Sequence, residues 1–159
     1  RTQMTLKAEF EKAGGRFFLG DTAVDAAFDN NGNVVSIGTA NFGDIRMTAE
    51  NFVLATGSFF SKGMVATPEK VYEPVFGLDL IYGEKRENWF DRNFWNRQEY
   101  VSYGAKVNSR LNPSINNTPV GNLYVIGSLL GGGNALYEGS GGGTAIISAL
   151  AAADAILEK

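Results

Sequence analysis

The chain has 159 residues, of which 44% are hydrophobic and 19% are charged, a composition typical of a globular domain with a buried core. Its formal net charge of −3 and its scattered basic residues argue against a nucleic-acid interface. The sequence contains no cysteine and no histidine, which excludes disulfides, zinc sites, cysteine-ligated iron–sulfur clusters and a histidine base within this chain. Any redox chemistry here would therefore require an organic cofactor.

The ends of the sequence carry no recognisable targeting signal. The longest apolar run, residues 145–157, is short for a membrane span and contains Asp154. No signal peptide is visible, and Arg1 is not an initiator methionine. We therefore expect the chain to be a piece of a longer protein that forms a single domain over residues 1–159.

The chain begins with a predicted helix followed by a predicted strand. Residues 2–13 place Leu6 and Phe10 on one helical face, and the Gly14-Gly15 pair is typical of a helix end. Residues 16–20, Arg-Phe-Phe-Leu-Gly, then predict a short buried strand. A helix, a tight turn and a strand in this order are typical of a layered α/β domain.

An antiparallel meander is predicted over residues 22–48. Two runs of alternating apolar residues flank Asn31-Gly32, which is a strong signal for a hairpin turn. A second turn at residues 41–43 leads into a third short strand at residues 45–48. Such a meander is usually structural, so we assign no chemistry to it.

Two apolar runs, residues 52–55 and 123–126, predict buried strands of a parallel sheet. Small residues follow both of them: Thr56-Gly57-Ser58 after the first and Gly127-Ser128 after the second. Ligands of open α/β sheets bind outside the carboxyl ends of the strands, so both positions are candidates for a binding site. Taken alone, Ala-Thr-Gly at residues 55–57 is a weak signal, because such a tripeptide can also form a simple turn.

The last predicted element is a helix over residues 144–159, with Ile146, Leu150 and Leu157 at helical spacing. The glycines at residues 139–143 would leave amide N–H groups exposed at its start, which suits an anion or an electron-rich ring edge. Tight packing of the helix on its own sheet explains the same glycines equally well from the residues alone.

The middle segment, residues 59–121, is rich in aromatic and basic side chains and contains four prolines, which argue against long regular elements. One interpretation is a surface where arginines hold an anionic substrate or a partner. The interpretation that we favour is a loop-rich layer packed by aromatic rings, with its charges in solvent.

Common catalytic motifs are not found. Residues 57–63 and 15–20 do not match a phosphate-binding loop, because the lysine is absent or wrongly spaced. Residues 139–144 lie too far after their strand to form a dinucleotide fingerprint. Glu138 and Asp154 are too far apart in sequence to indicate a catalytic carboxylate pair.

The order of these motifs resembles the carboxyl-terminal half of flavoproteins related to the fumarate reductase flavoprotein subunit, in particular the anaerobic glycerol-3-phosphate dehydrogenase branch. The resemblance covers nearly the whole chain and rests on Ala-Thr-Gly-Ser-Phe-Phe at residues 55–60, Glu-Pro-x-x-Gly-Leu-Asp at residues 73–79 and Gly-Ser-x-Leu-Gly-Gly at residues 127–132. It implies an α/β fold: part of an FAD/NAD(P)-binding-type domain with a parallel sheet core and an antiparallel β-meander. The three expected parts of this single domain are residues 1–58, residues 59–121 and residues 122–159.

The resemblance implies that the full-length protein binds a flavin, FMN or alternatively FAD. Gly127 matches the glycine of a Gly-Asp pair that holds the flavin ribityl chain in many relatives, and Ser128 replaces that aspartate with an uncharged hydroxyl. The glycine-rich helix start matches the segment that faces the flavin pyrimidine edge, where a helix amino end stabilises negative charge on the reduced ring. The cofactor-binding residues implied in this way are Ala55, Thr56, Gly57, Gly127, Ser128, Gly141, Gly142, Gly143 and Thr144.

The resemblance also implies an activity and an assembly. The expected function is that of a flavin-dependent oxidoreductase subunit that oxidises sn-glycerol 3-phosphate to dihydroxyacetone phosphate and passes electrons to quinone. Its expected partners are a catalytic flavoprotein subunit and an iron–sulfur membrane-anchoring subunit, which would hold it in the cytoplasm at the inner membrane. Lys62 and Arg110 are candidate contacts for the anionic substrate, whereas no catalytic residue and no metal ligand is assigned.

Two alternatives remain: a non-catalytic scaffold or electron-transfer subunit of the same complex, and another fumarate-reductase-like flavoenzyme acting on a different small acid. We further expect the chain as given to fold, but to hold no flavin tightly and to turn over no substrate. It would supply only one side of the cofactor site. Its uncovered sheet edge would also favour self-association.

Overall fold

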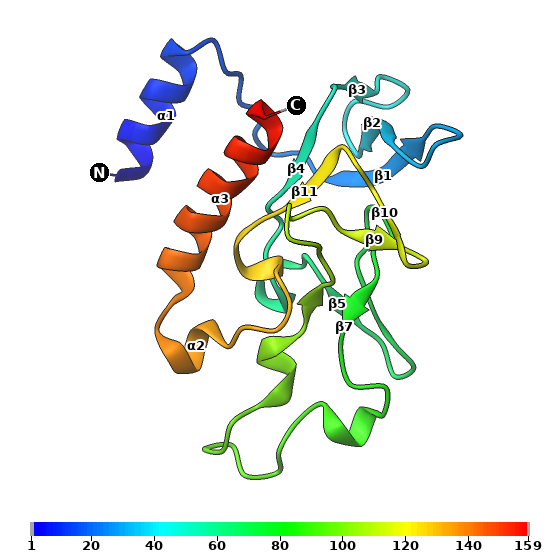
Figure 1. Cartoon of the computed structure of the whole chain (residues 1–159), viewed down its shortest axis with the longest axis vertical. Coiled ribbons are helices and arrows are strands. Elements are labelled where there is room, and N and C mark those ends of the chain that lie inside the picture. The colour runs from blue at the N-terminus through cyan, green and yellow to red at the C-terminus, as the bar shows by residue number, and fades with distance from the viewer. Residues whose placement is uncertain (1, 159) are drawn as a thin grey trace.

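The computed structural model describes residues 2–158. A parallel strand pair lies at the centre, with a meander at one end, a loop-rich segment at the other and a long helix alongside (Figure 1). No helix among the described residues is long and apolar enough to cross a membrane.

The helices are α1 (Thr2–Lys12), α2 (Ala135–Glu138) and α3 (Gly141–Leu157), and the 3-10 turns are η1 (Phe59–Ser61), η2 (Arg86–Asn88), η3 (Glu99–Ser102) and η4 (Gly127–Leu129). The strands are β1 (Ala23–Phe28), β2 (Val34–Thr39), β3 (Met47–Thr48), β4 (Phe52–Leu54), β5 (Val65–Ala66), β6 (Val71–Tyr72), β7 (Leu80–Ile81), β8 (Gly104–Ala105), β9 (Ser114–Ile115), β10 (Thr118–Pro119) and β11 (Leu123–Val125).

The predicted meander is confirmed: β1, β2 and β3 pair antiparallel in sequence order. Its first turn is fixed by Asp29, whose Oδ1 accepts hydrogen bonds from the N–H groups of Asn31 (2.9 Å) and Asn33 (2.8 Å). Gly32 has a φ of +79°, which explains why glycine suits this position of the turn.

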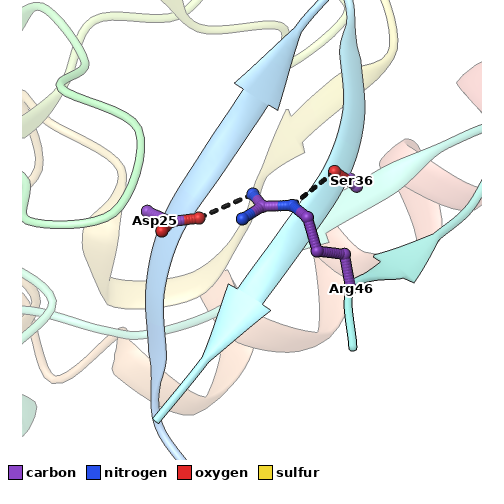
Figure 2. A network of polar contacts seen from close by, with 3 residues as sticks. All are labelled: Asp25, Ser36 and Arg46. Carbon is purple, nitrogen blue, oxygen red and sulfur yellow. Dashed lines mark hydrogen bonds and ion pairs between the residues drawn. The ribbon is translucent and has the colours of Figure 1, made fainter. Parts of the chain in front are cut away.

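An arginine ties the strands of the meander together (Figure 2). Arg46, just before β3, donates from Nη2 to Asp25 Oδ1 on β1 at 2.6 Å and from Nε to Ser36 Oγ on β2 at 2.8 Å. A β-carbon at Gly38 would lie 2.6 Å from Asp25 Oδ1, so a glycine leaves room for this contact.

The central pair consists of β4 and β11, which run parallel with Phe52 opposite Leu123 and Leu54 opposite Val125. All three residues of β11 are buried, as the continuous apolar run predicted. Asn122 joins this pair to the meander, because its Nδ2 donates to the Val34 carbonyl (2.7 Å) and its Oδ1 accepts the Val34 N–H (2.9 Å).

The prediction of a strand at residues 16–20 is wrong. This segment is irregular, and Phe17, Phe18 and Leu19 are exposed. The Phe17 ring instead packs edge-on against Phe10 of α1, with ring centroids 4.8 Å apart. Apolar residues alone do not make a strand, because a strand needs a neighbour to complete its backbone hydrogen bonds, and none pairs with this segment in the described part of the chain.

The predicted carboxyl-terminal helix is confirmed as α3, but its large apolar residues are not the ones that face the sheet. Ile146, Leu150 and Leu157 are exposed, whereas Ser148, Ala152 and Ala155 are buried. Ala152 and Ala155 pack against Tyr124 of β11, and small residues let the helix approach this large side chain closely. The helix begins at Gly141, three residues earlier than predicted; its predicted last residue, Lys159, lies outside the described residues.

The middle segment is loop-rich, as we favoured from its prolines. Its strands, β5 to β10, are two residues long and are joined by loops and 3-10 turns. Tyr82 and Tyr103 pack edge to face at 6.3 Å, and Phe59 contacts Tyr100 and Tyr103 at 6.4 and 6.5 Å. Aromatic packing therefore replaces regular structure as the source of order here.

Candidate functional site

Each of the two central strands is followed, within three residues, by a glycine with a left-handed backbone. After β4, Gly57 has a φ of +79°; after β11, Gly127 has a φ of +68°. The two turns lie side by side, since a β-carbon built on Gly57 would come within 3.3 Å of Ser128 Oγ and would overlap Ser61 Oγ. The carboxyl edge of the sheet therefore presents closely spaced backbone, as expected where a ligand binds an α/β sheet.

Ser148 fixes α3 to this edge. Its Oγ accepts the Gly127 N–H at 2.9 Å and donates to the Thr144 carbonyl of the preceding helical turn at 2.6 Å. Ser148 is the buried polar residue of the helix. The first turn of α3 is thereby held beside the end of β11.

The start of α3 offers unpaired backbone donors. The first intrahelical hydrogen bond runs from the Thr144 N–H to the Ser140 carbonyl at 2.9 Å. Within the described chain, the N–H groups of Gly141, Gly142 and Gly143 have no hydrogen-bond partner, and the Ser140 side chain does not cap the helix. This end therefore carries the partial positive charge and free donors that favour an anion or an electron-rich atom.

A pocket of about 240 Å³ lies where these elements meet. Gly127 and Ser128 form one side and Gly141 and Thr144 another, while aromatic and aliphatic side chains supply most of the remaining wall. Its volume is just below the roughly 300–1,000 Å³ of complete ligand sites, so it suits part of a large cofactor. The other side chains that line it include Phe59, Phe60, Tyr100, Val101, Leu130, Leu136 and Glu138.

The structure brings most of the predicted cofactor residues together. Gly127, Ser128, Gly141 and Thr144 line the pocket, and Gly57 lies directly beside Ser128. Gly142 and Gly143 continue the first turn of α3, and a β-carbon at either would meet no atom within 4 Å. Ala55 is exposed at the end of β4.

Thr56 supplies an observation that favours a missing binding partner. Its Oγ1 is buried, yet it has no hydrogen-bond partner among the described residues. A buried hydroxyl without a partner is unfavourable by about 1–3 kcal/mol. Thr56 does not line the pocket, and Asp21 Oδ2 and Thr39 Oγ1 in the meander are unpartnered in the same way. The position of Thr56 at the carboxyl end of β4 is what makes its hydroxyl a candidate contact for a ligand.

The two predicted substrate contacts do not line the pocket. Lys62 follows η1 with a left-handed backbone and an exposed side chain. Arg110 lies at the carboxyl end of α3, the opposite end from the pocket, where its Nη2 donates to the Ala155 carbonyl at 2.7 Å and its Nη1 lies 4.0 Å from Glu158 Oε2. These contacts show that Arg110 binds the carboxyl end of α3, where a positive charge is favourable. A role in substrate binding stays a prediction for both Lys62 and Arg110.

The motif at residues 73–79 shapes loops instead of the pocket. The buried Glu73 carboxylate accepts hydrogen bonds from the N–H groups of Phe76 (2.7 Å) and Gly77 (3.0 Å). Burial raises the pKa of Glu73, and the backbone hydrogen bonds oppose that rise. Asp79 Oδ2 accepts hydrogen bonds from Asn117 N–H and Ser114 Oγ, both at 2.7 Å, and so fixes the β9–β10 hairpin.

Sequence reasoning missed several residues of the site. Ser148 had no signal beyond being a polar residue within an apolar helix. Phe60 and Leu136 belong to distant segments, and only the folded chain brings them to one pocket. No group of three or more metal-ligating side chains occurs among the described residues.

Comparison with known proteins shows the family to which this chain belongs. A family model described as "FAD binding domain" matches residues 1–144. The chain belongs to this FAD-binding family. The fold predicted from the resemblance is thereby confirmed, and the glycine turns, the free helix amides and the orphaned Thr56 hydroxyl fit the flavin that the family binds.

Curated relatives cover nearly the whole chain. It is 42% identical over 164 residues to a protein of Haemophilus influenzae (strain PittEE) that is named as a subunit of anaerobic glycerol-3-phosphate dehydrogenase, covering 100% of the chain and 38% of that protein. It is 38% identical over 154 residues to the protein of the same name from Vibrio vulnificus (strain YJ016), covering 96% of the chain and 35% of that protein. The chain therefore spans little more than a third of these relatives. No solved structure matches.

Proposed function

We propose that this chain forms one wall of the flavin site in a subunit of a glycerol-3-phosphate dehydrogenase. The observation that carries the proposal is the meeting of the unpaired N–H groups at the start of α3 with the two glycine turns at the strand ends, around one pocket. The family model supports FAD, and the resemblance in the sequence supports FMN as the other candidate. When bound, a flavin supplies the two-electron chemistry that this chain's own side chains lack.

Different residues of the chain would contact different parts of the cofactor. The amides of Gly141 and Gly142 would stabilise negative charge at the polar edge of the ring system by roughly 1–2 kcal/mol, the effect of a partly buried helix end. The Ser128 hydroxyl would hydrogen-bond the ribityl chain, and the Thr56 hydroxyl would gain the partner that it lacks. The aromatic and aliphatic wall would exclude water from the ring.

The activity that we propose for the whole protein is oxidation of sn-glycerol 3-phosphate to dihydroxyacetone phosphate, with electrons passed to quinone. The name of the curated relatives supports a dehydrogenase of several subunits. A partner flavoprotein subunit and an iron–sulfur anchoring subunit would hold this protein in the cytoplasm, peripheral to the inner membrane.

A second candidate is favoured by the charge of the pocket. Among its described lining residues none is lysine or arginine, and Glu138 contributes a carboxylate. A phosphate ester needs cationic partners, which this wall does not supply. This favours an arrangement in which a partner subunit holds the substrate and the present protein serves as a flavin-binding scaffold or electron-transfer subunit.

The test is a substitution at the start of α3 in the full-length protein. Gly142→Val places a branched side chain where no described atom lies within 4 Å, so folding should be preserved while flavin occupancy falls. Ala149→Val, at an exposed position of the same helix, is the matched control. Flavin content is measured from the visible spectrum and folding from the thermal midpoint. Equal flavin content in Gly142→Val and the parent would remove the helix start from the site.

A measurement on the full-length protein alone separates the two candidates. A catalytic subunit would bleach its flavin when sn-glycerol 3-phosphate is added. A scaffold or electron-transfer subunit would bleach only after its partner subunit is added as well.

A further inference from the structure

One carboxylate lies in the wall of the candidate flavin pocket. Glu138, the last residue of α2, lines the pocket together with Ser140, Gly141 and Thr144 at the start of α3. Among the described lining residues, it is the only one with a charged side chain. Only two residues separate it from Gly141, so the carboxylate and the unpaired helix amides belong to the same part of the wall.

Hydrogen bonds hold this carboxylate in place. Glu138 Oε1 accepts the Asn134 N–H at 3.4 Å, and Oε2 accepts the Ser140 hydroxyl at 3.2 Å. Asn134 is itself buried and caps α2, because its Oδ1 accepts the Tyr137 N–H at 3.0 Å. The short helix that carries Glu138 is therefore closed at its start, and the charge has a defined place in the wall.

The charge of Glu138 is not neutralised within the described part of the chain. Glu138 forms no ion pair there. The Arg97 guanidinium lies instead over the ring of the adjacent Tyr137, 6.0 Å from its centroid. The Glu138 carboxylate also leaves the first N–H groups of α3 free, since no side chain of the described chain accepts from them.

The free amides and the carboxylate act in opposite directions on a bound flavin. Reduction by two electrons with uptake of one proton adds one negative charge to the flavin ring. The amides at the start of α3 stabilise that added charge, whereas a carboxylate in the same wall repels it. The balance between the two sets how readily the cofactor is reduced.

We propose that the Glu138 carboxylate lowers the redox potential of the flavin bound in this pocket. The inference rests on the proposed function, because it takes the ligand of the pocket to be a flavin. A lower potential makes the reduced cofactor a better electron donor, so Glu138 would favour the passage of electrons onward from the site. The helix amides alone would favour their retention on the cofactor.

The experiment compares charge variants of the full-length protein purified with its flavin. The potential is measured at pH 7 by titration with dithionite in the presence of a reference dye. Glu138→Gln keeps the size of the side chain and one acceptor oxygen but removes the charge. Because Glu138 is exposed in this chain and water screens its charge, the expected change in the ratio of reduced to oxidised flavin is about 3- to 10-fold. This corresponds to a rise in potential of about 14–30 mV for a two-electron couple.

Two further substitutions separate charge from structure. Glu138→Lys reverses the charge and should raise the potential further than Glu138→Gln. Glu138→Asp keeps the charge and should stay closer to the parent than Glu138→Gln does. A carboxylate that only stabilises the helix start would give no such order of potentials.

Glu50→Gln is the matched control. Glu50 is exposed and lies just before β4, at the opposite end of that strand from the pocket. It undergoes the same change in charge, and its backbone carbonyl keeps the hydrogen bond from Asn122 Nδ2 (3.1 Å). Its potential should equal that of the parent.

The outcomes separate this inference from the proposed function. If the parent holds no flavin, the proposed function falls and this inference falls with it. If the parent holds flavin and Glu138→Gln and Glu138→Lys have its potential, or if Glu50→Gln shifts the potential as much, this inference alone is overturned. It is also overturned if Glu138→Gln loses its flavin while circular dichroism shows an intact fold, because the carboxylate would then hold the oxidised cofactor.

Discussion

The Gly127 N–H donates to Ser148 Oγ across 2.9 Å, so a single hydroxyl joins the end of β11 to the start of α3. This contact aligns two walls of the pocket, since Gly127 belongs to one wall and the first helical turn to the other. The same hydroxyl donates to the carbonyl of Thr144, a residue that lines the pocket as well. Ser148 therefore acts on the site through the positions of its neighbours.

Ser148→Ala should destabilise the fold by about 1–3 kcal/mol, because the Gly127 N–H loses its partner in a half-buried position. In the full-length protein it should also lower flavin affinity, because the helix start is no longer held at the strand end. Chemical denaturation and flavin titration measure the two effects. Ser109→Ala, at an exposed position, is the control and should change neither. Unchanged stability in Ser148→Ala would show that the hydrogen bond is not important for the fold.

Ser128 allows a test of the ribityl contact that is independent of the helix. Ser128→Ala should weaken flavin binding by roughly 0.5–1.5 kcal/mol, the contribution of a neutral hydrogen bond. Ser128→Asp should strengthen it, because a carboxylate makes a stronger hydrogen bond to a sugar hydroxyl. Flavin titration of the full-length protein measures both. If neither variant changes the affinity, the Gly127-Ser128 pair is only a turn.

Asp79 predicts a loss of stability in acid. Burial raises its pKa, but hydrogen bonds from its neighbours and the charge of Lys106 outweigh that effect, so its pKa lies below the ordinary value of 3.8. The stabilisation is fully present above the unfolded pKa and is lost as the pH falls toward the folded pKa. Asp79→Asn should therefore be less stable than the parent at pH 7, by about 1–3 kcal/mol, with a difference that shrinks below pH 4.

Urea denaturation at pH 7, 5 and 3 measures this dependence. Asp44→Asn, which removes a carboxylate from an exposed turn of the meander, serves as the control. A stability difference for Asp79→Asn that stays constant from pH 7 to pH 3 would contradict the assigned role of the charge.

The chain as given should fold without holding flavin tightly. Its pocket is smaller than a complete ligand site, and the donors described here face one part of a cofactor. The measurement adds excess FAD or FMN, removes unbound cofactor by gel filtration and records the visible spectrum. A retained flavin band near one equivalent would show that this wall is sufficient for the site.

Local sequence signals predicted much of this fold. Asn31-Gly32 and the alternating residues around it predicted the β1–β2 hairpin, because turn chemistry acts over a few residues. The apolar runs at β4 and β11 predicted the parallel strand pair. Burial is confirmed for all three residues of β11, whereas Val53 of β4 is 48% exposed, so β4 is covered on one face only. The local sequence of these elements is therefore sufficient to predict them.

Tertiary contacts decided the features that the sequence did not predict. Ala152 and Ala155 of α3 pack against Tyr124, together with the partly buried Ile156, whereas Ile146 and Leu150 lie on the exposed face of the helix. Hydrophobic spacing indicates which residues share a face, and it does not indicate which face another element covers. In the same way, the glycines of the site were visible in the sequence, whereas Phe60 and Leu136 join the pocket only through folding.

The pairing of β4 with β11 has a consequence for biosynthesis. Leu123 lies 71 residues after its partner Phe52, so most of this chain must be translated before the central pair can form. The meander uses nearby residues and can assemble while the ribosome is still adding the loop-rich segment. Until β11 emerges, β4 would expose an unpaired, apolar edge to solvent. A nascent chain stalled before residue 123 should therefore recruit chaperones more strongly than one released after it.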